Sequence, residues 1–144
     1  MPRLKLEYAV AAGLAVVVAM VVMNLVNSDV RWCQRVFAGL VKGNPSVRSA
    51  IAWDRFRAED VDVGATYARL PNAQEQLGYQ QGFIQSFSKG FQEEGGRLRS
   101  FTNWRAETDG SVAVDYPAKQ KTLLFHLSAE AGRRQLVGIG WQQP

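Results

Sequence analysis

The chain has 144 residues, a formal net charge of +4 and a hydrophobic content of 47%. This length suits one small domain and leaves little room for a second. The positive charge is mild and spread along the chain, whereas nucleic-acid-binding proteins usually gather Lys and Arg on one surface. We therefore expect no nucleic-acid partner. The single cysteine, Cys33, excludes an intramolecular disulfide and a cysteine-based zinc site.

The most apolar stretch of the chain covers residues 9–26, AVAAGLAVVVAMVVMNLV, which a single asparagine interrupts. As a helix this run spans roughly 27 Å, close to the ~30 Å core of a lipid bilayer. A cleaved signal peptide is the alternative, but the run is too long for one, and the Asn-Ser-Asp that follows offers no small-residue cleavage site. The sequence thus predicts a short tail over 1–8, a transmembrane helix over 9–26 and a domain over 27–144.

The charges that flank this run nearly balance. Arg3 and Lys5 precede it, and Arg31 and Arg35 follow it. The first pair lies immediately beside the run, and a long C-terminal domain can be translocated regardless of its charge. We therefore expect a cytoplasmic N-terminus, a periplasmic domain and a location in the bacterial inner membrane, with the lipid bilayer as one partner.

Two features of this region suggest contacts. Ala11, Ala15 and Ala19 recur every four residues, and small side chains at that spacing allow another helix to approach closely. An Ala-rich run also produces such a row by chance. Arg31 and Trp32 are placed where a membrane interface would lie, although Trp32 could equally belong to the domain core.

Helical periodicity dominates the first half of the predicted domain. Apolar residues recur at helical spacing over 28–42, over 46–56 and most clearly over 72–94, whereas 57–70 breaks the period and is predicted to be mostly loop. These segments predict two or three helices.

The third helix has a recognisable start and an unusual composition. Asn72 and Glu75 are spaced as a capping box. Gly78, Gly82 and Gly90 each cost up to ~1 kcal/mol relative to Ala in a helix. We expect these glycines to allow close packing of the helix against a curved sheet.

Beyond Arg97 the hydrophobic period changes to two. Strands are predicted over 97–107, 111–116, 121–128 and 134–142, with short turns between them. Helices followed by a meander of strands predict an α+β domain, with two or three helices on one face of a four-stranded antiparallel sheet.

This order of elements, with the segments FIQSFSKGF and FTNWRAE, resembles the NTF2-like (cystatin-like) α+β cone over Asp29–Gln142. The resemblance implies a strongly bent sheet around the long helix. Membrane-anchored members include bitopic assembly subunits of type IV secretion machines, so it also implies an anchored interaction domain. Enzymes of the family, such as ketosteroid isomerases and dehydratases, use Asp, His or Tyr inside the cone.

The residues that could supply such chemistry are Asp115, Tyr116 and His126. Leu123 and Phe125 alternate with His126 along one strand, so the apolar pair is expected to face the core and His126 the outside. Asp115 lies beside a turn, where Asp commonly binds backbone groups. We therefore expect no enzymatic activity and no cofactor.

A basic face is predicted on the first strand of the meander. Alternation places Arg97, Arg99, Phe101 and Arg105 on one side, where they could meet an acidic protein surface or anionic lipids. The alternative is a solvated sheet face, on which Arg stems cover apolar surface.

The chain also has an acidic loop that contains Glu59, Asp60 and Asp62. Calcium sites need more oxygen ligands in a defined loop and a distal bidentate acid. The spacing does not match, so a solvated loop and no metal are expected.

These observations lead to one functional hypothesis and an alternative. The first is a single-pass membrane protein that acts as a non-catalytic accessory or scaffold subunit of a membrane complex. The alternative is a membrane-tethered cone that binds or transforms a small molecule, for which a deep pocket with convergent polar groups would be evidence. Pairing of two copies through the sheet is a further option.

Overall fold

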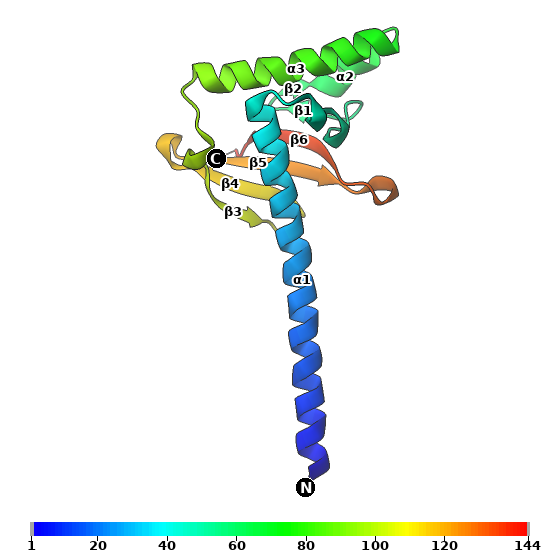
Figure 1. Ribbon diagram of the computed structural model, residues 1–144, viewed down its shortest axis with the longest axis vertical. Coiled ribbons are helices and arrows are strands. Elements are labelled where there is room, and N and C mark those ends of the chain that lie inside the picture. The colour runs from blue at the N-terminus through cyan, green and yellow to red at the C-terminus, as the bar shows by residue number, and fades with distance from the viewer. Residues whose placement is uncertain (1, 144) are drawn as a thin grey trace.

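The computed structural model describes residues 2–143, and the side chains of these except for 2–8, 22, 24–26 and 131. It is an α+β structure in which two long helices pack on one mixed sheet (Figure 1). Its elements, in chain order, are α1 (Pro2–Lys42), η1 (Pro45–Ala50), β1 (Arg57–Ala58), β2 (Val61–Asp62), α2 (Val63–Ala68), α3 (Ala73–Glu93), η2 (Leu98–Ser100), β3 (Thr102–Ala106), β4 (Val112–Tyr116), η3 (Pro117–Lys119), β5 (Lys121–Ser128), η4 (Glu130–Gly132) and β6 (Gln135–Trp141).

Helix α1 has two parts with different surroundings. Its C-terminal part, residues 28–42, packs into the domain and buries Cys33, Phe37 and Leu40 almost completely. Its N-terminal part extends away from the domain (Figure 1). We call residues 9–27 the helical arm; the described side chains of the arm are all exposed.

The predicted transmembrane helix over 9–26 is wrong. Among the helices that the structure describes, none combines the length and the apolarity that crossing a membrane requires. Three further predictions depended on this span and are corrected with it, namely the single-pass topology, the periplasmic domain and the inner-membrane location. The apolar run does not form a separate element between loops; it is the first part of a longer helix that ends inside the domain.

The predicted four-stranded antiparallel sheet is also wrong. The sheet has six strands in the order β2-β1-β6-β5-β4-β3, and β1 pairs with β6 in parallel. The strands β1 and β2 have two residues each, so they are too short to show a period of two in the sequence. They pair as a hairpin whose turn contains Glu59 with a left-handed φ of 57°.

The first strand of the meander is shorter than predicted. Residues 98–100 form the 3₁₀ turn η2, and the strand β3 begins only at Thr102. The pairing of β3 with β4 shifts register between Thr102 and Arg105. Asn103 lies at this bulge with a φ of 59°, a conformation that Asn tolerates better than most residues.

The core lies between α1, α3 and the sheet, and Phe37 is at its centre. The Phe37 ring contacts five other aromatic rings at centroid distances of 5.0 to 6.4 Å, mostly edge to face. These rings come from α3, from the residue before β3, from β3 itself and from β5, and belong to Phe87, Phe91, Phe101, Trp104 and Phe125.

A buried hydrogen bond joins the end of α1 to α3. The last carbonyl groups of a helix have no partner within it, and the Ser88 hydroxyl of α3 donates to the Val41 carbonyl of α1 at 2.6 Å. Gly43, with a φ of 69°, then ends α1 in the left-handed conformation that glycine adopts at low cost. The two helices are therefore held together at a defined position.

The glycines of α3 do not play the predicted role. A Cβ atom at Gly78, Gly82 or Gly90 would meet nothing within 4 Å, so these positions are not closely packed. The close approach occurs at Gly39 of α1, where a Cβ atom would come within 2.2 Å of Val47 Cγ1. A second difference concerns 46–56, of which only the first residues form the short 3₁₀ helix η1.

We expect Gly39→Ala to destabilise the protein by about 1–3 kcal/mol, because the stiff, buried Val47 side chain cannot move aside without strain. Urea unfolding measures this difference. Gly78→Ala is the matched control, since the added methyl meets open space; it should be neutral or stabilise the protein by up to ~1 kcal/mol. Equal effects of the two substitutions would contradict the packing described for Gly39.

Candidate functional site

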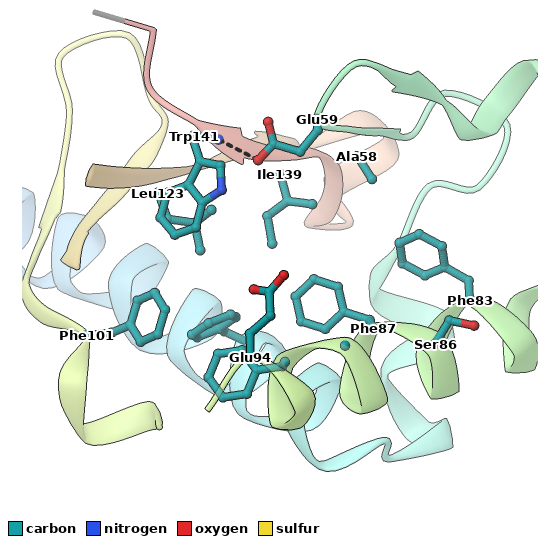
Figure 2. Close-up of a pocket in the computed structure, with 13 residues that line it drawn as sticks. Ala58, Glu59, Phe83, Ser86, Phe87, Glu94, Phe101, Leu123, Ile139 and Trp141 are labelled. Atoms are coloured by element: carbon teal, nitrogen blue, oxygen red, sulfur yellow. Dashed lines mark hydrogen bonds between the residues drawn. The ribbon is translucent and has the colours of Figure 1, made fainter. Parts of the chain in front are cut away.

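A cavity of about 400 Å³ opens between α3 and the concave side of the sheet (Figure 2). Its walls come from α1, from the turn after β1, from α3 and from the strands β5 and β6, together with the residue before β3. Its size is within the range of natural small-molecule sites. The residues that line it are Phe37, Ala58, Glu59, Phe83, Ser86, Phe87, Gly90, Phe91, Glu94, Phe101, Leu123, Ile139 and Trp141.

The helical wall of the cavity follows from the sequence of α3. The helix starts at Asn72, whose side chain accepts a hydrogen bond from the Glu75 amide at 2.9 Å, in agreement with the predicted cap. Phe83, Phe87 and Phe91 then recur every four residues, so they share one face of the helix. This face is turned toward the sheet and is half-buried.

Small residues beside this aromatic face keep the cavity open. Ser86 and Gly90 line it next to the phenylalanines, and the space where a Gly90 side chain would lie contains no other atom within 4 Å. A side chain at this position would therefore project into open space next to the cavity.

The sheet wall is formed by side chains that alternate along two paired strands. Leu123 of β5 pairs with Trp141 of β6, and Ile139 lies two residues before Trp141 on the same face. Phe101, the residue before β3, closes one end and stacks on Tyr116 at 4.5 Å between ring centroids. The wall is almost entirely apolar.

Two carboxylates provide the charged groups of the cavity. Glu59 follows β1, and one of its oxygens accepts a hydrogen bond from the Trp141 amide at 2.9 Å. A Cβ atom at Gly140 would lie 3.4 Å from the other Glu59 oxygen, so this carboxylate lies against the backbone of β6 at ordinary van der Waals distance. Glu94 follows the last residue of α3, and Figure 2 shows its carboxylate pointing between the helix and the sheet.

The residues predicted to pack against another helix or to lie at a membrane interface are not part of this cavity. Ala11, Ala15 and Ala19 are exposed on the helical arm, and their packing against another helix stays a prediction. Arg31 is exposed, whereas Trp32 packs against the core with the Arg134 guanidinium 5.8 Å from its ring centre. The membrane-interface role of Arg31 and Trp32 was predicted together with the transmembrane helix, and the contacts of these two residues do not test it.

The predicted basic face on one strand is not formed as a single surface. Arg97 and Arg99 are exposed around the turn η2, but Phe101 is buried at 7% exposure and faces the cavity. Arg105 lies in β3 and forms ion pairs with Glu107 and Asp115, at 3.0 Å each. The turn η2 breaks the alternation on which the prediction rested, and whether these arginines bind a partner stays a prediction.

The residues considered for catalysis do not meet at one site. His126 is exposed on the outer face, whereas Leu123 and Phe125 are buried, as the alternation predicted. Tyr116 faces inward and stacks on Phe101. The Cys33 thiol is buried, and burial raises its pKa to about 12, so it is not poised as a nucleophile.

Asp115 instead organises a polar network on the outer face of the sheet. Its carboxylate accepts hydrogen bonds from Asn103 Nδ2, Arg105 Nη1 and Thr122 Oγ1, each at 3.0 Å. These bonds favour the ionised form and lower the pKa of Asp115, with the Asn103 bond as the largest cause. The network joins β3, β4 and β5.

The acidic loop has structural partners. Asp62 caps α2 by accepting a hydrogen bond from the Ala65 amide at 3.0 Å. Within the described part of the chain, no three His, Cys, Asp or Glu side chains gather as metal ligands would.

Comparison of the sequence with protein-family models, and comparison of the chain with curated proteins and with solved structures, finds no match. The resemblance to a membrane-anchored NTF2-like domain is therefore not supported. Two structural findings also contradict this resemblance: the sheet is six-stranded and mixed, and none of the described helices could span a membrane.

Sequence reasoning missed the cavity and both of its carboxylates. The sequence predicts a solvated loop at Glu59 and the end of a helix at Glu94, and neither position carries a motif. The one available signal was the regular spacing of aromatic residues in α3, which indicated a buried face but not a gap beside it.

We expect Asp115→Asn to lower stability at pH 7, because the folded protein favours the ionised carboxylate. The folded pKa of Asp115 lies below its unfolded value of about 3.9, so this contribution is present above that pH and is lost as pH falls through the folded pKa. Urea unfolding at pH 7 and at pH 3 should show the difference between variant and wild type shrinking in acid. Asp60→Asn, outside the network, is the control. A difference that stays constant with pH would refute the assignment.

Proposed function

We propose that this protein is a non-catalytic accessory subunit that joins a larger protein assembly through its helical arm. The observation that carries the proposal is the exposure of large apolar side chains along the arm. Eight of them are between 54% and 65% exposed, namely Val10, Leu14, Val16, Val17, Val18, Met20, Val21 and Met23.

The arrangement of these side chains favours a partner that surrounds the arm. At 100° per residue, consecutive positions such as 16, 17 and 18 point in different directions, so the arm is apolar on every side. A helix of this kind is normally buried among other apolar elements, and exposed apolar patches mark interaction sites. Each such side chain contributes about 1.5–3 kcal/mol when it is fully buried.

The base of the arm is held firmly by the domain. Arg134 forms an ion pair with Asp29 at 3.0 Å and donates a hydrogen bond to the Ser28 hydroxyl at 3.2 Å. Because α1 continues without a break into the core, a partner bound to the arm would hold the domain in a defined orientation. This is the property expected of an accessory or scaffold subunit.

A photo-crosslinking amino acid at Val17 should yield covalent adducts with other proteins in the cells that produce the chain, because this side chain is 57% exposed. Mass spectrometry identifies the adducts. The same amino acid at Thr66, an exposed position on α2, is the control and should yield none.

A charged variant tests the same proposal without crosslinking. Val17→Asp should reduce the co-purified partner by about tenfold, because burial of an unpaired carboxylate is costly. Its melting temperature should equal that of the wild type, since the arm extends beyond the domain. Adducts only between copies of this chain, or no adducts at all, would contradict the proposal.

Binding of a small molecule is the second candidate function, and the open aromatic cavity favours it. An uncharged naphthylamine dye should gain fluorescence with the wild-type protein, because apolar walls surround the cavity. Gly90→Leu should abolish this gain by filling the space beside Phe87 and Phe91. Gly78→Leu, outside the cavity, should leave it unchanged. Equal fluorescence with both variants would exclude the cavity as the dye site.

A further inference from the structure

We propose that the cavity between α3 and the sheet binds an organic cation, a protonated or quaternary amine attached to a small apolar body. This inference rests on the second candidate function, the binding of a small molecule in the cavity, and names the chemical class of its ligand. It is argued from the charges at the cavity, from the end of α3 and from the aromatic walls.

The ionisable groups of the cavity all have one sign. Of the residues that line it, Glu59 and Glu94 can ionise, and none is a lysine, arginine or histidine, although the chain carries 17 basic and 13 acidic residues. Among the described residues, neither carboxylate forms an ion pair. The cavity is thus acidic in a chain of net charge +4.

The end of α3 adds to this negative potential. The C-terminus of a helix carries roughly half a negative charge, which basic side chains commonly offset. The last turn of α3 contains no basic residue, and it is followed directly by Glu94. Lys89, one turn earlier, is paired with Glu93 instead. A cation at this end of the cavity would therefore meet both the helix terminus and a carboxylate.

The walls offer the other groups that stabilise an organic cation. The faces of aromatic rings attract cations, most strongly in sites shielded from water. Figure 2 shows the Glu94 carboxylate between the rings of Phe87 and Phe101, with Trp141 across the cavity. Trp141 already has an ammonium group near its ring, since Lys121 Nζ lies 5.4 Å from the ring centre without lining the cavity.

The test compares three probes of similar size. They are trimethyl(phenylethyl)ammonium, its uncharged isostere in which carbon replaces the ammonium nitrogen, and the phenylbutyrate anion. Binding to the full chain is measured by saturation-transfer NMR, with calorimetry where solubility allows. We expect the cation to bind about fivefold more tightly than the isostere, or more, and the anion to bind least.

Glu94→Gln keeps the shape of the side chain and removes its charge. It should weaken binding of the cation by about fivefold and leave binding of the isostere unchanged. Glu93→Gln is the matched control, because Glu93 is exposed and does not line the cavity. Gly90→Leu should abolish binding of both probes.

The outcomes separate the two proposals. Equal binding of cation and isostere, or a preference for the anion, would overturn the inference and leave ligand binding in the cavity intact. Failure of all three probes to bind the wild type would overturn both. Binding that survives Gly90→Leu would place the ligand elsewhere and also overturn the inference.

Discussion

The aromatic cluster around Phe37 is the interaction on which the rest of the structure depends. This ring projects from α1 and contacts rings from α3, from Phe101 just before β3 and from β5. The contacts are mostly edge to face, the geometry that aromatic quadrupoles favour. Phe37 also lines the cavity, so the ring that fastens α1 to the sheet is part of the candidate site.

Helix α1 connects the two surfaces to which we assign roles. Its arm extends from one side of the domain, whereas α3 lies across the opposite end of α1 (Figure 1). The Ser88 hydrogen bond to the Val41 carbonyl fixes the far end of α1, and Arg134 fixes the base of the arm through Asp29. A partner on the arm would therefore leave the cavity open to a ligand, and both proposals can hold for one protein.

Sequence patterns succeeded where the decisive contacts are local. The cap at Asn72 is formed as predicted, because it needs only the amide of a residue three positions ahead. Phe125 is buried and His126 exposed, because strand alternation separates neighbours. The patterns failed where a turn interrupts an expected strand or where the surroundings of a helix decide its role. Because the turn η2 interrupts the strand, Phe101 is buried and does not share a face with the arginines. The apolar composition of residues 9–26 was not enough to establish a membrane span.

By itself, the sequence determined that residues 28–42 and 72–94 contain helices with apolar faces and that paired strands follow. It could not determine how many strands the sheet has, because β1 and β2 have two residues each and join the sheet only through the pairing of β1 with β6. The tertiary structure alone decided the cavity. Glu59, Glu94 and Trp141 come from three distant segments of the chain. The space beside Gly90 stays open because no described side chain of the surrounding elements reaches it. Such a site has no local signature, because its shape and charge arise only when the helices and the sheet pack together.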